Sequence, residues 1–361
     1  MENITITCIS HTPKTVPIEK SIGMVLLHDI TEIRKDDFKG VAFKKGHIIK
    51  EQDLDHLKRI GKENIFAFNI GKDELHEDDA AIRIANSLIG QGVRIQGEPK
   101  EGKINLAAQY RGLLKIDSKR LLRLNMLGEI MCATLHNNTY VHENQIVAGT
   151  RAIPLVIKKN IVVKAERLLK RDSTAVIEVQ RLNKPKAGIV ITGNEIYYRR
   201  VKDAFAPILT SKIEALDGEV IDIYFSPDNV EDIVKGLNVL IQKDINLLIT
   251  TGGMSVDPDD LTRFAISKIG ARGIVYGSSV LPGAMFMVSY IDVRKENTIT
   301  TIPILSIPAC GMYYKTTIFD VLLPRILAGE MITRKEIAEL GHGGLCLNCK
   351  VCNFPICPFC K

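Results

Sequence analysis

The chain has 361 residues, of which 45% are hydrophobic and 25% are charged, with 27 glycines and 14 prolines. These are the proportions of an ordinary globular protein, and they exclude a disordered chain, a collagen and a coiled coil. No apolar run approaches the roughly 18 residues that a membrane-spanning helix needs, and the first residues lack the pattern of an export signal, so a cytoplasmic protein of two or three domains is expected.

The formal net charge is +6, and it is concentrated in residues 151–185, which carry nine Lys or Arg against three Asp or Glu. A solvated linker or sheet face is the simpler interpretation of this stretch, and an anion-facing surface is the alternative. The chain has no Trp and only 6% aromatic residues. Nucleic-acid binding is therefore not expected, because basic and aromatic side chains are not interleaved.

The first half of the chain predicts small α+β units. From residue 16 to about 71, short apolar runs mix with Gly and Lys, and residues 51–60 have the pattern of a short helix. A second helical pattern at residues 78–88 precedes alternating segments. We expect one unit over residues 1–75 and another over residues 76–185, the latter including the basic stretch as a linker.

From residue 187 onward, apolar strand patterns alternate with helical ones. The strands are expected at residues 187–192, 219–225, 245–251, 284–291 and 298–307, and the helices at residues 204–217, 228–243 and 312–327. Gly218 is a natural stop for the first helix, and Pro324 is expected to end or kink the last. The almost wholly apolar third strand indicates a sheet covered on both faces, so the fold class is α/β, with a three-layer αβα domain over residues 186–335.

Two of these strands end in residues suited to binding an anion. Thr192-Gly193-Asn194-Glu195 follows the first strand, and TTGGMSVDPDD at residues 250–260 follows the third. Ligands collect at the carboxyl ends of strands in open α/β sheets. The paired glycines let backbone N–H groups face one point without obstruction, and Thr251 and Ser255 add hydroxyl donors.

Three carboxylates crowd the same segment. Asp257, Asp259 and Asp260 lie beside the anion site, which is unfavourable unless they bind a cation or ligand donors. Asp259 is better explained as a turn residue next to Pro258. Asp260 also suits the N-terminus of the following helix, but we favour a functional role for it.

Residues 187–329 resemble the molybdopterin-binding domain that is shared by molybdopterin adenylyltransferases, molybdopterin molybdenumtransferases and gephyrin. TGNE at residues 192–195 is similar to that family's TGDE motif, and residues 250–260 are similar to its TGGxSxGxxD loop. LPGA at residues 281–284 is similar to its Pro-Gly-Lys-Pro turn, and IPACGM at residues 307–312 to a later proline-rich loop. Residues 16–30 are similar to the leucine-rich opening segment of the molybdenumtransferases.

The resemblance implies roles for individual residues. Asp260 and Glu195, with Asp257, would form the catalytic acidic set beside Mg²⁺ and molybdate. The residues implied to bind molybdopterin are Thr192, Gly193, Asn194, Thr251, Gly252, Gly253, Ser255, Pro282 and Gly283. A homodimer is also implied.

The last sixteen residues contain Cys346, Cys349, Cys352, Cys357 and Cys360, with the spacing C-x2-C-x2-C-x4-C-x2-C. Thiolates two residues apart can hold one metal from a tight turn, so the tail predicts a zinc site or an iron–sulfur cluster. An unmetallated tail is the alternative. Crowding of this kind in a cytosolic protein points to metal or redox chemistry rather than to disulfides.

The leading hypothesis is therefore an enzyme of molybdenum cofactor biosynthesis that inserts molybdate into adenylylated molybdopterin with loss of AMP. The alternative is a non-catalytic carrier that delivers the cofactor to a molybdenum enzyme, with the cysteine tail as a docking or sulfur-handling element. Ala284-Met285 stands where the family has Lys-Pro, and the tail stands where the transferases have a β-barrel. Both features favour the carrier.

Overall fold

The computed structural model describes residues 15–34, 38–170, 174–254, 261–295 and 298–361. These residues form two compact units. Unit 1 comprises the described residues up to Tyr110, together with Lys115–Leu135 and His142–Val179. Unit 2 comprises Arg111–Leu114, His136–Val141 and Gln180–Lys361.

Unit 1 begins with a small α+β fold. Its elements are β1 (Thr15–Pro17), β2 (Val25–Leu26), β3 (Ile30–Arg34), β4 (Phe38–Phe43), α1 (Asp53–Arg59) and β5 (Asn64–Phe68). Strand β5 pairs antiparallel with β1 and β2, while β3 and β4 form a hairpin. The core contains Ile18, Ile49 and Ile65, and α1 adds Leu57 to it. The helix expected at residues 51–60 is α1.

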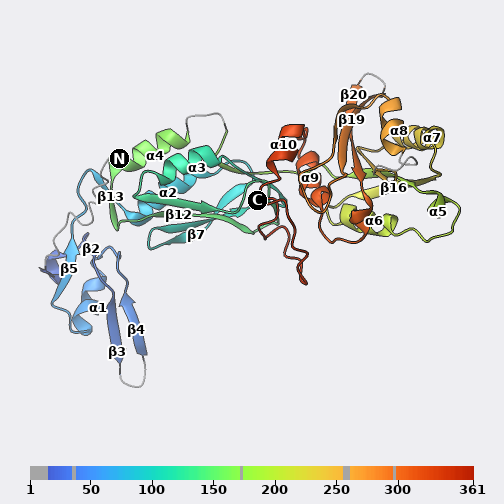
Figure 1. Ribbon diagram of the computed structural model, residues 1–361. Helices are drawn as coiled ribbons and strands as arrows, with labels where there is room; N and C mark the ends of the chain where they lie inside the picture. Colours follow the sequence, from blue (N-terminus) through green and yellow to red (C-terminus); the bar gives the residue numbers. More distant parts are fainter. Residues whose placement is uncertain (1–14, 35–37, 171–173, 255–260, 296–297) are drawn as a thin grey trace. The chain divides into compact units, whose positions relative to one another are not determined.

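The rest of unit 1 is a sheet with helices on it (Figure 1). Its elements are β6 (Glu74–His76), α2 (Glu77–Leu88), β7 (Val93–Lys100), β8 (Lys103–Ala108), α3 (Ser118–Asn125), β10 (Ile130–Thr134), β12 (Ile146–Ala152), β13 (Val156–Lys158) and α4 (Lys159–Leu169). The strand order β10-β12-β8-β7 is antiparallel throughout. Helices α2 and α3 pack on this sheet, and α4 packs on both helices. Residues 159–169 of the basic stretch form helix α4, so this part of it is not a linker.

Three further strands contain or adjoin the residues at which the chain passes from one unit to the other. They are β9 (Gly112–Ile116), β11 (Tyr140–Val141) and β14 (Ile177–Gln180). Within unit 2, β11 pairs antiparallel with the first residues of β9, so that Tyr140 lies opposite Leu113.

The α/β domain of unit 2 follows these strands. Its strands are β15 (Lys186–Thr192), β16 (Glu219–Ser226), β17 (Leu247–Thr251), β18 (Arg272–Tyr276), β19 (Met287–Lys295) and β20 (Thr298–Ile307). Its helices are α5 (Asn194–Tyr197), α6 (Phe205–Glu214), α7 (Val230–Ile241), α8 (Thr262–Lys268), α9 (Ile318–Leu327) and α10 (Arg334–Glu339).

The sheet of this domain has the order β16-β15-β17-β20-β19-β18. The first four strands are parallel, and β19 and β18 continue the sheet antiparallel. Helices α7 and α8 pack on one face through residues such as Leu237 and Ile266. Helices α6 and α9 pack on the other face through residues such as Leu209 and Leu322. The α/β class and the three-layer arrangement are thereby confirmed.

Two local expectations for this domain need correction. Helix α9 continues to Leu327, so Pro324 does not end it. The sequence patterns also missed β18, a short edge strand in which three of the five residues are exposed. An edge strand with one exposed face lacks the continuous apolar run that marks the central strands.

Candidate functional site

The ends of β15 and β17 lie against each other. The Oγ1 of Thr192 donates a hydrogen bond to the backbone oxygen of Thr251 at 3.1 Å. Gly252 follows with a φ of +82°, and a Cβ at this position would lie 2.5 Å from both the backbone oxygen and the Oγ1 of Thr192. Only glycine fits, because a side chain would clash with backbone and would require a strained left-handed conformation.

Gly253 makes a second close approach, to the start of α8. Its φ is +56°, and a Cβ there would lie 2.6 Å from the Oγ1 of Thr262. That hydroxyl donates to the backbone oxygen of Gly252 at 2.9 Å. Thr262 is wholly buried, and the sequence analysis did not single it out. The two buried threonines, Thr192 and Thr262, therefore leave no room for a side chain at either glycine of the pair.

Thr251 itself carries an unusual hydroxyl. The residue is fully buried, and its Oγ1 has no hydrogen-bond partner among the described residues. A buried hydroxyl without a partner is unfavourable. This one belongs to the residue directly before the glycine pair.

Gly193 and Glu195 follow the end of β15. Gly193 has a φ of +140°, and a Cβ on it would lie 2.8 Å from the Oε1 of Glu195. The exposed Glu195 carboxylate therefore folds back over Gly193, in the first turn of α5. Its position at the strand end leaves it accessible to a cation or to a ligand donor.

Asn194, where the resembled family has Asp, is bonded to the turn before α7. The backbone N–H of Asn194 donates to the Oδ2 of Asp228 at 2.8 Å. The backbone N–H of Asp228 donates in return to the Oδ1 of Asn194 at 3.2 Å. An Asp at position 194 would place two carboxylates together here, so the amide avoids a repulsion.

Tyr276, at the end of β18, forms a hydrogen bond with the residue that follows the glycine pair. Its hydroxyl donates to the backbone oxygen of Met254 at 2.9 Å and lies 3.2 Å from the Sδ of Met285. The guanidinium of Arg263 lies over the Tyr276 ring, 4.3 Å from its centroid. Met285 stands where the resembled family has the Pro of its Lys-Pro turn, and here it contacts an aromatic residue.

The remaining predicted site residues are of two kinds. Ser255, Asp257 and Asp260 lie outside the described residues. A Cβ on Gly283 would lie 2.5 Å from the Cγ2 of Ile318, and Pro282 accepts a hydrogen bond from the backbone N–H of Ile318 at 3.3 Å. Their contacts are therefore with the start of α9.

A cavity of about 590 Å³ lies beside α5 and near the end of β16. Its lining includes Tyr197, Arg199, Lys202 and Phe225. Two aromatic rings with two cations suit a flat, charged ligand. The sequence analysis missed these residues, although three of them, Tyr197, Arg199 and Lys202, lie in the run IYYRRVK that directly follows TGNE.

The zinc or iron–sulfur site predicted for the cysteine tail stays a prediction. Among the described residues, no group of three or more His, Cys, Asp or Glu side chains is arranged to hold a metal ion. Cys349 and Cys352 are exposed, whereas Cys346, Cys357 and Cys360 pack against the α6 and α9 side of the domain core.

Phe359 is the centre of that packing. It is 5% exposed, and its ring meets the Phe354 ring edge-on at 6.3 Å between centroids. The Nζ of Lys361 donates to the Oγ1 of Thr139 at 2.9 Å. Burial raises the pKa of the Cys360 thiol to about 12 and lowers the pKa of Lys361. The tail is therefore an ordered part of unit 2.

Comparison with known proteins identifies this domain. Residues 188–328 match a family model described as "Probable molybdopterin binding domain", and residues 15–69 match one described as "Domain of unknown function (DUF8806)". A CinA-like protein of Mycobacterium avium is 32% identical over 95 residues, which is 26% of this chain and 22% of that protein. A CinA-like protein of Mycolicibacterium vanbaalenii is 34% identical over 95 residues. The chain spans about a fifth of the length of these curated relatives.

Two solved structures are also similar. The tungsten cofactor synthesizing protein MoaB from Pyrococcus furiosus is 16% identical, with a TM-score of 0.31 over 40% of this chain and 96% of that one. The protein CinA from Thermoplasma acidophilum is 14% identical, with a TM-score of 0.33 over 40% of this chain and 98% of that one. Separately, none of the helices in the described ranges is long and apolar enough to cross a membrane.

Proposed function

Because residues 188–328 carry a molybdopterin-binding domain, we propose that the protein acts in molybdenum cofactor assembly. The specific reaction proposed is insertion of molybdate into adenylylated molybdopterin with release of AMP. The observation that carries the proposal is the bare backbone of Gly252 and Gly253 at the strand ends, between Thr192 and Thr262.

In this proposal the chain's own residues bind and orient the ligand. The backbone of the glycine pair lets a phosphate approach without side-chain obstruction, and the Thr251 hydroxyl gains the hydrogen bond that it lacks among described residues. The cavity with Tyr197 and Phe225 would hold a flat ring system beside the cations of Arg199 and Lys202.

Mg²⁺ is part of the proposal as a bound cofactor. Glu195 is an exposed carboxylate at the strand end, and carboxylate oxygens are the ligands that Mg²⁺ prefers. Glu195 would hold the ion together with Asp257 and Asp260, and bound Mg²⁺ would neutralise phosphate charge and polarise the reacting bond. A cytoplasmic location and a homodimer belong to the same proposal; light scattering tests the second.

The alternative is a carrier that binds molybdopterin and passes the cofactor to a molybdenum enzyme without turnover. The contact of Met285 with Tyr276 favours it, because an apolar side chain stands at the turn where the resembled transferases have Lys-Pro.

One experiment separates the two. The purified protein is incubated with adenylylated molybdopterin, molybdate and Mg²⁺, and bound pterin and released AMP are both measured. AMP release identifies the enzyme, and stoichiometric pterin binding without AMP identifies the carrier. Absence of both binding and release overturns the proposal.

A further inference from the structure

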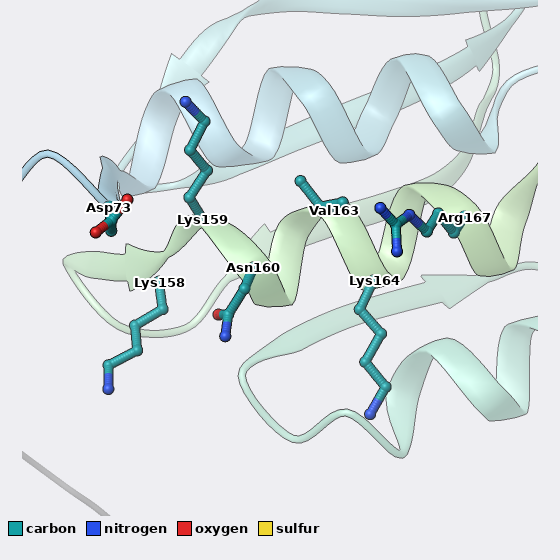
Figure 2. A pocket seen from close by; sticks show the side chains of 7 residues that line it. All are labelled: Asp73, Lys158, Lys159, Asn160, Val163, Lys164 and Arg167. Atoms are coloured by element: carbon teal, nitrogen blue, oxygen red, sulfur yellow. The ribbon is translucent and has the colours of Figure 1, made fainter.

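A second cavity, of about 600 Å³, lies in unit 1, apart from the molybdopterin-binding domain. Its polar lining consists of Asp73 directly before β6, Lys158 at the end of β13, and Lys159, Asn160, Lys164 and Arg167 along α4 (Figure 2). The volume is in the range of sites for small ligands. The lining carries four cations against one carboxylate.

None of these four cationic side chains makes an ion pair or a hydrogen bond to another described residue. The nearby acid Glu166 is already used: its two carboxylate oxygens accept hydrogen bonds from Nε and Nη2 of Arg83, each at 2.8 Å. The cations of the cavity are therefore uncompensated within the described part of the chain.

The fold explains why these charges share one surface. Helix α4 buries Val162, Ala165 and Leu169. Because a helix repeats every 3.6 residues, Lys159, Val163 and Arg167 form one row on the remaining face, with Asn160 and Lys164 beside them. In Figure 2 the side chains of Lys158, Asn160 and Lys164 extend to one side of the helix, and that of Lys159 extends to the other.

This arrangement is unfavourable for the helix itself. The first turn of α4 contains no acidic residue, and the N-cap residue Lys158 makes no side-chain cap hydrogen bond. Lysines at a helix N-terminus oppose the helix dipole, and Lys164 and Arg167 repel each other at a spacing of three residues. Local sequence choices that oppose the fold are typical of functional sites.

The chemistry of the lining limits the ligand. Its only apolar member is Val163, and it contains no aromatic side chain on which a base could stack. Lysines act as point charges that bind phosphate oxygens. We propose that this α4 cavity binds a small polyphosphate through its phosphate chain, without recognising a base. Inorganic triphosphate and the triphosphate group of a nucleotide share this chemistry.

The test is isothermal titration of the full chain with inorganic tripolyphosphate, ATP and GTP at two salt concentrations. We expect all three to bind with Kd values within about threefold of one another, and more weakly at high salt. The double variant Lys164→Gln/Arg167→Gln should weaken tripolyphosphate binding at least tenfold. A second double variant, Lys158→Gln/Lys159→Gln, should do the same from the other end of the cavity.

The matched control is Lys119→Gln/Arg123→Gln, which removes one Lys and one Arg from the exposed surface of α3 in the same unit. It should leave binding unchanged. No tripolyphosphate binding by the wild type, equal losses in control and cavity variants, or binding of ATP alone overturns the proposal. Binding of single-stranded RNA but not of tripolyphosphate overturns it as well. All variants sit on exposed positions, and circular dichroism checks their folding.

Discussion

Asn194 and Asp228 bind each other through two hydrogen bonds that join the end of β15 to the turn before α7. Each backbone N–H donates to the partner's side-chain oxygen, at 2.8 Å to Asp228 and at 3.2 Å to Asn194. The pair fixes the backbone that follows Gly193, and Gly193 in turn lies under Glu195. Two residues that are 34 positions apart therefore set the geometry of the proposed molybdopterin site.

A double-mutant cycle measures this pair. Asn194→Ala and Asp228→Ala should each lower the free energy of unfolding by about 1–2 kcal/mol, because each leaves the backbone N–H of the other residue without its acceptor. The double variant should lose less than the sum, with a coupling of about 0.5–1.5 kcal/mol in urea unfolding. Strict additivity would show that the two residues act independently.

Gly252 offers a prediction with a close control. Gly252→Ala should remove molybdopterin binding and lower the free energy of unfolding by more than about 3 kcal/mol, because strain and a clash with Thr192 add together. Gly270 has nearly the same φ, +85°, but nothing lies within 4 Å of its added Cβ. Gly270→Ala should lose only about 1 kcal/mol and keep full binding. Equal losses in the two variants would contradict the close approach.

Because of Glu77, in the first turn of α2, we expect the stability of unit 1 to depend on pH. Burial raises its pKa from 4.5 to about 7, helped by Asp78 and opposed by Arg151 and Lys45. The native carboxyl therefore keeps its proton between pH 4.5 and 7, while the unfolded chain ionises. The contribution of Glu77 to the free energy of unfolding is therefore fully present below pH 4.5. It is lost as the pH rises through 7, and the total loss is about 3 kcal/mol.

Urea unfolding at pH 5 and pH 8 checks this. Glu77→Gln should remove that loss and should be more stable than the wild type at pH 8. The control Asp79→Asn changes an exposed carboxylate in the same helical turn, and it should keep the wild-type decrease. A Glu77→Gln protein with the same decrease would show that another group titrates.

The packing of the tail predicts a stability effect. Phe359→Ala should lower the free energy of unfolding by about 3–5 kcal/mol, because Phe359 is 5% exposed and its removal opens a cavity. Leu347, in the same tail, is 78% exposed. Leu347→Ala should change stability by less than about 0.5 kcal/mol. Similar small effects from both variants would show that the tail is not docked.

Thiol labelling tests the state of the cysteines. Iodoacetamide at pH 8 should modify Cys349 and Cys352 first, because both are exposed. Cys360 should react slowly, since burial raises its pKa to about 12 and the thiolate is the reactive form. Mass spectrometry of the peptides gives the order. Protection of Cys349 and Cys352 until a chelator is added would instead support the metal site that the spacing predicts.

The α/β domain of unit 2 could be predicted from its residues alone. Its central strands are continuous apolar runs because both faces are covered, and runs such as residues 187–192 and 245–251 can be read directly. TGNE and the TTGG segment also located the strand ends, because small and hydroxyl-bearing residues after buried strands have few purely structural explanations. The edge strand β18 could not be found in this way, since its exposed face interrupts the apolar pattern.

Which side chains meet depends on how the strands and helices pack in three dimensions. Thr262 lies 70 residues from its partner Thr192, and Asp228 lies 34 residues from Asn194. Tyr276 lies 22 residues from Met254. No local pattern encodes such distances, because strand order and helix packing set them. The same holds for the basic stretch: its nine cations are visible in the sequence, but the burial of one face of α4 decides that four of them line one cavity.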